Sequence, residues 1–159
     1  MNDKIVDENR ICIFGHSYGG YAALMGVIRE QSLYKCAIGS MGVYDLPMMF
    51  EEANKADSKS GVAYLKEVLG EDLNVQKLRS PAYNADKIKA EVLLIHGDKD
   101  VRAPIEQVES MKQALDNVGK SYQYLEFLNE AHGYRDEKNR VKMFNKIFSF
   151  LDEHIGKDN

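Results

Sequence analysis

The chain is poor in cysteine and carries no cluster of positive charge. Its two cysteines, Cys12 and Cys36, both sit inside apolar runs. This usage predicts buried free thiols rather than a disulfide, and therefore a protein of a reducing compartment, the cytoplasm. The 21 lysines and arginines stand against 25 aspartates and glutamates, a net charge of −4. Because nucleic-acid-binding proteins usually show a basic face, we expect no nucleic-acid partner.

Long apolar runs are also absent. The longest purely aliphatic stretch, Val92 to Ile95, is far shorter than the about 20 residues that cross a bilayer. The N-terminal residues, Met1 to Arg10, are polar, so we expect neither a signal peptide nor a membrane partner. No His-x-x-x-His or Cys-x-x-Cys spacing occurs, which argues against a metal site, and we expect no cofactor.

What the sequence does contain is typical of one globular domain. Hydrophobic residues make up 44% of the 159 positions and charged residues 29%, and no repeat, low-complexity tract or linker divides them. Apolar runs bounded by glycine alternate with helical stretches, the signature of a parallel α/β sheet. The four predicted strands are residues 11–14, 36–43, 92–95 and 122–128. The first two have the apolar character of strands buried on both faces, and the last that of an edge strand.

Helical spacing fills the gaps between these strands. Residues 21–29 follow the first strand, and a second clear helix begins near Pro104 and ends at Gly119. The C-terminal helix is predicted to bury one stripe, namely Val141, Phe144, Ile147, Phe148, Leu151 and Ile155. Between the second and third strands, an excursion with helices near 48–56 and 60–69 is interpreted as a surface connection or a partial lid.

A G-x-S-x-G motif follows the first strand directly, in the segment Gly15-His16-Ser17-Tyr18-Gly19-Gly20. Strand, sharp turn and helix are the context that a nucleophile elbow requires. We expect Gly15 and Gly19 to supply the room for the strained turn at Ser17. The backbone N–H of Tyr18, at the start of the helix, is predicted to face a developing oxyanion.

A nucleophilic serine needs a carboxylate and a histidine, which follow it in that order in this fold. Asp100, after the third strand, is the predicted acid. Asp98 is the near rival, with the alternative role of a turn residue. Asp45 is a third contender, and the sequence favours it as a helix cap.

Four histidines compete for the role of base. His132 lies in the loop after the last strand, from which a ring can reach back over the sheet to Ser17. His16 neighbours the serine, but its side chain is expected to point away. His96 is expected to make a local hydrogen bond beneath the site, and His154 lies on a late helix turn. We therefore predict that His132 takes the proton of Ser17 while Asp100 orients the ring.

With these elements located, the chain resembles the catalytic domain of the prolyl oligopeptidase family, especially its acylaminoacyl peptidase and dipeptidyl peptidase branches. The likeness covers residues 9–152. It rests on the elbow, on Ser80-Pro81, on the segment Val92 to Asp100 and on the segment Glu130 to Tyr134. The resemblance assigns the same three residues: the elbow serine is Ser17, the acid is Asp100 and the histidine is His132. One departure is Ala103-Pro104, where the family commonly has Val-Pro.

The resemblance also implies parts that these residues do not contain. The family's α/β-hydrolase domain normally has about four further strands before the elbow, an oxyanion-hole tyrosine and a β-propeller that restricts substrates to peptides. We therefore expect residues 1–159 to be a partial α/β-hydrolase domain, the C-terminal part of a larger hydrolase. Its elbow strand would have an unpaired edge, and the missing helix would leave an apolar face of the sheet bare. We expect a homo-oligomer that forms through that edge or through that face.

Three functions remain open at this point. The first is a serine peptidase, and the second is a carboxylesterase for small acyl groups, because activated esters need less oxyanion stabilisation than peptides. The third is an inactive fragment or assembly module. Arg102, beside the acid, is a candidate contact for a substrate carbonyl, although a solvated surface arginine is the simpler interpretation.

Overall fold

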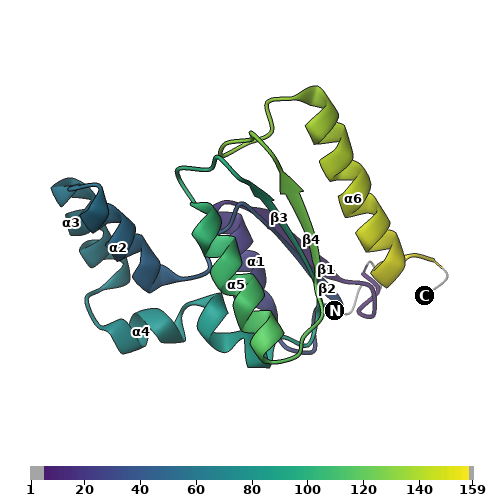
Figure 1. The fold of residues 1–159 in the computed structure, drawn as a ribbon. Coiled ribbons are helices and arrows are strands. Elements are labelled where there is room, and N and C mark those ends of the chain that lie inside the picture. The colour runs from purple at the N-terminus through teal and green to yellow at the C-terminus, as the bar shows by residue number, and fades with distance from the viewer. Residues whose placement is uncertain (1–5, 158–159) are drawn as a thin grey trace.

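Four parallel strands form the centre of the computed structural model, which describes residues 6–157 and, for residues 54 and 55, the backbone alone (Figure 1). The strands are β1 (Cys12–His16), β2 (Cys36–Ser40), β3 (Glu91–Gly97) and β4 (Gln123–Phe127), and they lie in the sheet in the order β1-β2-β3-β4. Each pairs in parallel with the next. The predicted α/β fold with four parallel strands is confirmed, and β4 is an edge strand as expected.

The prediction that both of the first two strands are buried on two faces is wrong for β1. Every residue of β2 is buried, because β1 and β3 flank it. Strand β1 instead forms the second edge of the sheet, and its residue Phe14 is 49% exposed. Apolar composition alone does not distinguish a central strand from an edge strand, since both carry the same residue types.

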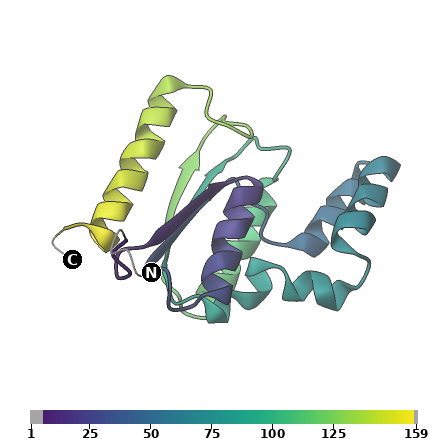
Figure 2. The ribbon, with the colours of Figure 1, turned by 180° about the vertical axis from the view of Figure 1, so that it is seen from behind.

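Helices cover both faces of the sheet (Figures 1 and 2). Helices α1 (Tyr18–Arg29) and α5 (Ile105–Asn117) pack on one face, and α6 (Glu137–Ile155) packs on the other. Gly119, at a φ of 68°, ends the turn after α5, as its position indicated. None of the described helices is long and apolar enough to cross a membrane.

Helix α6 buries a different stripe from the predicted one. Met143, Ile147 and Phe150 face the sheet, whereas Phe144 and Phe148 are 47% and 63% exposed. Apolar residues with three-to-four spacing occur on two sides of this helix, so periodicity could not decide which side faces the sheet.

The excursion between β2 and β3 folds into four short helices beside the sheet (Figure 1). Helices α2 (Leu46–Lys55) and α3 (Lys59–Leu69) lie close to the predicted ranges. Helix α4 (Leu73–Leu78) and the 3₁₀ helix η1 (Pro81–Lys87) were not predicted, because each is too short to show a periodic pattern. Side chains cap three of the starts, since Asp45 accepts a hydrogen bond in α2, Ser58 in α3 and Asp72 in α4.

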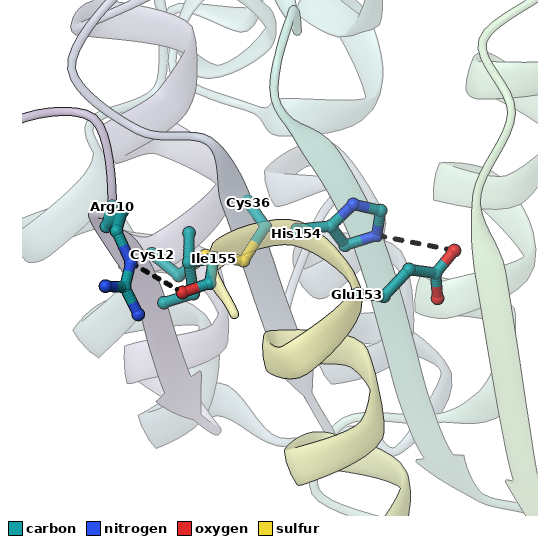
Figure 3. The surroundings of a disulfide bond; sticks show 6 residues. All are labelled: Arg10, Cys12, Cys36, Glu153, His154 and Ile155. Atoms are coloured by element: carbon teal, nitrogen blue, oxygen red, sulfur yellow. Dashed lines mark hydrogen bonds and ion pairs between the residues drawn. A yellow bond between two sulfur atoms is a disulfide. The ribbon is translucent and has the colours of Figure 1, made fainter. Parts of the chain in front are cut away.

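Cys12 and Cys36 form a disulfide, which corrects the prediction of free thiols (Figure 3). The two residues are register partners on β1 and β2, with Cα atoms 4.6 Å apart, a separation that a disulfide can span. The C-terminal end of α6 lies over the bond, and the carbonyl of Ile155 accepts a hydrogen bond from Arg10 Nε at 2.8 Å. The expectation of a cytoplasmic protein depended on free thiols and loses that support.

Candidate active site

Ser17 lies in the turn between β1 and α1, in a backbone conformation that non-glycine residues rarely adopt. Its φ is 58° and its ψ −123°. Gly15 makes this turn possible, because a Cβ at Gly15 would collide with the backbone of Gly19. A Cβ at Gly19 would meet nothing within 4 Å, so the expectation that both glycines supply room is correct only for Gly15.

The turn at Ser17 presents the serine hydroxyl and the first backbone N–H groups of α1. The N–H of Ser17 donates to the carbonyl of Ser40 at 2.8 Å, which ties the turn to the end of β2. The hydroxyl does not cap α1 and is available for another partner. Tyr18 begins α1, and backbone N–H groups in a first helical turn have no intrahelical acceptor. Such N–H groups bind negative charge.

Asp100 is held in a fixed position just after β3. Its Oδ1 accepts hydrogen bonds from the backbone N–H groups of Arg102 and Ala103, at 2.8 and 2.9 Å. Its Oδ2 lies 2.7 Å from His132 Nδ1, and the residue is only 4% exposed. The carboxylate therefore has one oxygen for the loop and one for the histidine.

His132 connects Asp100 with Ser17. Its Nε2 lies 2.8 Å from Ser17 Oγ, while its Nδ1 faces Asp100. An ionised carboxylate only accepts hydrogen bonds, so Nδ1 carries a proton. In the neutral ring Nε2 is then the unprotonated nitrogen and accepts from the Ser17 hydroxyl. The structure thus brings together the three side chains that the sequence singled out.

The rival carboxylates have other partners. Asp98 accepts a hydrogen bond from the backbone N–H of Asn129 at 2.5 Å. Asp45 accepts from the backbone N–H of Met48 at 3.2 Å, in the first turn of α2, which agrees with the predicted helix cap. Neither carboxylate contacts His132.

His96 and His16 lie near the site in different ways. His96 is fully buried, and its Nε2 donates to the carbonyl of Ala103 at 2.7 Å, the local bond expected of it. Burial lowers its pKa below 6.5. The prediction that His16 points away is wrong, because its ring centroid lies 5.3 Å from that of His132. Ser40 Oγ holds the ring in this position through a hydrogen bond with His16 Nδ1 at 3.1 Å, and Ser40 Oγ in turn bonds to Tyr134 Oη.

Glu130 anchors the loop that carries His132, a role that the motif reading missed. Its carboxylate accepts hydrogen bonds from Asn139 Nδ2 at 2.7 Å and from the backbone N–H groups of Arg135 and Asp136. The bond from Asn139 and those from the backbone hold the pKa of Glu130 below its usual value. The sequence feature that could have identified Glu130 is its position two residues before the histidine in the Glu-x-His-Gly segment.

Arg102 lies beside the acid, with an exposed side chain. Its backbone binds Asp100, but its guanidinium makes no hydrogen bond or ion pair within residues 6–157. No group of three or more metal-ligating side chains is found in that range either.

Comparisons with known proteins show which family this chain resembles. The model of the prolyl oligopeptidase family matches residues 1–158. The chain is 27% identical to the uncharacterized peptidase YuxL of Bacillus subtilis, over 96% of this chain and 23% of that protein. It is 26% identical to dipeptidyl aminopeptidase BIII of Pseudoxanthomonas mexicana, over 98% of this chain and 23% of that protein.

Solved structures show the same relationship. A puromycin-hydrolyzing peptidase of Mycobacterium tuberculosis superimposes with a TM-score of 0.86 at 28% identity, over 96% of this chain and 23% of that one. The acylaminoacyl peptidase of Pyrococcus horikoshii gives a TM-score of 0.82 at 28% identity, over 96% of this chain and 25% of that one. The chain thus spans about a quarter of the length of these relatives, and it belongs to the prolyl oligopeptidase family of peptidases.

Proposed function

We propose that this chain carries the nucleophile, acid and base of a serine peptidase that works through an acyl-enzyme. The observation that carries the proposal is the continuous pair of hydrogen bonds from Ser17 Oγ through His132 to Asp100, at 2.8 and 2.7 Å. The peptidase names of the relatives support a peptide as substrate.

The reaction follows from the protonation states of these groups. As Ser17 Oγ bonds to the carbonyl carbon, its proton passes to His132 Nε2, and Asp100 stabilises the resulting imidazolium. The carbonyl oxygen becomes an oxyanion, to which the N–H of Tyr18 can donate. Collapse of this intermediate breaks the C–N bond, and His132 gives its proton to the leaving amine. Water then attacks the acyl-enzyme by the same proton transfers and frees Ser17.

Labelling with a fluorophosphonate tests the nucleophile. We expect one equivalent of label on Ser17, found by intact mass and peptide mapping, and none in Ser17→Ala. His132→Gln should slow labelling by several orders of magnitude, because no base remains within reach of the hydroxyl. A wild-type chain that is folded but unlabelled would favour the inactive module.

A second measurement separates the two enzyme functions. Among the described residues we assign one N–H donor, that of Tyr18, to the oxyanion. This assignment supports the small-acyl esterase, because activated esters need less oxyanion stabilisation than peptides. Hydrolysis of a nitrophenyl ester together with a peptide anilide supports the peptidase, whereas hydrolysis of the ester alone supports the esterase.

Removal of the exposed Arg102 guanidinium by Arg102→Ala should raise KM for the peptide if the guanidinium contacts a substrate carbonyl.

We also propose that two copies of this chain associate through β1. One side of β1 has no partner strand among the described residues, and Phe14 on this strand is 49% exposed. Exposed strand edges pair readily with other chains. Light scattering at low micromolar concentration should show a dimer or larger species, and Phe14→Lys should shift it toward the monomer.

A further inference from the structure

A second hydrogen-bonded chain runs beside Ser17, His132 and Asp100. Tyr134 Oη lies 2.7 Å from Ser40 Oγ, and Ser40 Oγ lies 3.1 Å from His16 Nδ1. These residues come from the loop after β4, the end of β2 and the end of β1. His16 immediately precedes Ser17, and Tyr134 follows His132 by two positions.

The direction of these bonds follows from burial. Tyr134 stays protonated, because burial raises the pKa of its phenol to about 12. Its hydroxyl has no other acceptor within residues 6–157, so it donates to Ser40 Oγ. Ser40 is fully buried and cannot turn to water, so its own proton goes to His16 Nδ1.

The neutral form of His16 completes this arrangement. Nδ1 can accept a hydrogen bond only when it is unprotonated. His16 is an exposed residue, and its partial desolvation lowers its pKa. The neighbouring His132 lowers that pKa further, whereas Asp100 acts in the opposite direction. The other polar ring that faces His16 belongs to Tyr134, at 6.3 Å between centroids.

Ser40 is the centre of this chain, because it contacts both halves of the site. Its carbonyl accepts the N–H of Ser17 at 2.8 Å, and its hydroxyl accepts from Tyr134 in the histidine loop. The rings of Tyr134 and Phe127, at the end of β4, pack edge to face with their centroids 5.2 Å apart. Hydrogen bonds through Ser40 thus connect the elbow with the histidine loop, independently of the bond between Ser17 and His132.

We propose that Tyr134, Ser40 and His16 are positioning residues that fix the distance between Ser17 and His132. This role rests on the proposed hydrolase function, since it acts through those two groups. A nucleophile and a base react efficiently only when they are held at hydrogen-bonding distance. Loss of one bond in the chain should therefore slow the chemical step without weakening the binding of a reagent.

Tyr134→Phe is the matched test, because it removes one oxygen and keeps the ring. We expect the maximal rate of fluorophosphonate labelling to fall roughly fivefold to tenfold, as for the loss of about one buried hydrogen bond, with half-saturation unchanged. Tyr124→Phe is the control, because the Tyr124 hydroxyl is buried and has no hydrogen-bond partner among residues 6–157. Its labelling rate should equal that of the wild type.

A double-variant cycle distinguishes a connected chain from separate packing effects. Ser40→Ala with Tyr134→Phe should be no slower than the slower single variant, because either change breaks the same route. Multiplying effects would contradict the proposal, as would a rise in the half-saturation concentration with no change in maximal rate.

Proton NMR gives a result that does not depend on turnover. The proton shared by His132 Nδ1 and Asp100 should give a downfield signal in the wild type and in Tyr124→Phe, and should broaden in Tyr134→Phe. An unchanged signal in Tyr134→Phe would overturn the positioning role. If the signal broadens in Tyr134→Phe but the fluorophosphonate does not label the wild-type protein, the positioning role stands and the proposed hydrolase function is rejected.

Discussion

His132 Nε2 and Ser17 Oγ lie 2.8 Å apart although 115 positions separate them and their strands form opposite edges of the sheet. Three strand spacings, about 14 Å, lie between β1 and β4. The loop after β4 therefore crosses the carboxyl ends of β3 and β2 to bring the ring to the serine. Gly97 permits this crossing, because a Cβ there would collide with the carbonyl of Glu130.

The arrangement of Asp100 predicts a large loss of activity in Asp100→Asn. The amide oxygen can still accept from the N–H groups of Arg102 and Ala103, so the fold should survive. The amide nitrogen would face His132 Nδ1 and favour the tautomer with its proton on Nε2, which cannot accept from Ser17. We expect the labelling rate to fall by about 10³–10⁴.

Asp98→Asn is the control for this variant, since Asp98 contacts Asn129 and not the ring. Its labelling rate should stay within about threefold of the wild type, as for a substitution remote from the reacting groups. Equal losses in the two variants, measured under the same conditions, would show that Asp100 does not act on His132.

The two glycines of the elbow should respond in opposite directions to alanine. Gly15→Ala places a Cβ against the backbone of Gly19, which cannot move without opening the turn, so we expect a loss of about 2 kcal/mol or more in the free energy of unfolding. Gly19→Ala meets no atom and lies in α1, and should stabilise the chain by about 0.5–1 kcal/mol. Urea unfolding of both variants measures these changes, and similar effects would contradict the close approach at Gly15.

Glu130 should make stability depend on pH in the acid range. Its pKa in the folded chain is lower than the ordinary 4.5, so its stabilising effect is complete above that value and is lost as pH falls toward the folded pKa. Glu130→Gln should cost about 1–2 kcal/mol near neutral pH, because one amide cannot accept all three hydrogen bonds. Urea unfolding should show that the difference in the free energy of unfolding between Glu130→Gln and the wild type shrinks below about pH 4.

Glu126→Gln provides the comparison for Glu130, because Glu126 is exposed on the neighbouring strand. It should change stability by less than about 0.5 kcal/mol at any of these pH values. A difference between Glu130→Gln and the wild type that grows in acid would show that its carboxylate does not hold the loop.

Reduction of the disulfide should weaken the attachment of β1. The bond joins residues 24 positions apart, and closure of such a loop stabilises a fold by about 3 kcal/mol. Dithiothreitol should lower the free energy of unfolding by that order, measured in urea with and without reductant. The variant with both Cys12→Ser and Cys36→Ser should have the reduced stability and show no further response to the reductant.

Local patterns in the sequence determined the elements and the chemistry of this protein. The α/β alternation, the Gly-x-Ser-x-Gly turn and the order serine, aspartate, histidine can be read along the chain, because each depends on residues close to one another. They predicted four parallel strands, the α/β-hydrolase likeness and the three side chains that meet at the sheet. Strand order and helix rotation depend on contacts between distant segments. The sequence patterns therefore did not show that β1 is an edge strand or which side of α6 faces the sheet.

Only the tertiary structure decided the pairing of Cys12 with Cys36, the inward turn of His16 and the outward face of Phe144 and Phe148. A disulfide requires that two strands be neighbours in the right register, which neither cysteine's own surroundings reveal. The chain from Tyr134 through Ser40 to His16 likewise joins three elements that no short motif connects. The residue types therefore specify what chemistry is available, and packing of the sheet specifies which of those groups touch, because hydrogen bonds act over a few ångströms while the sequence separates their partners by 24 to 94 positions.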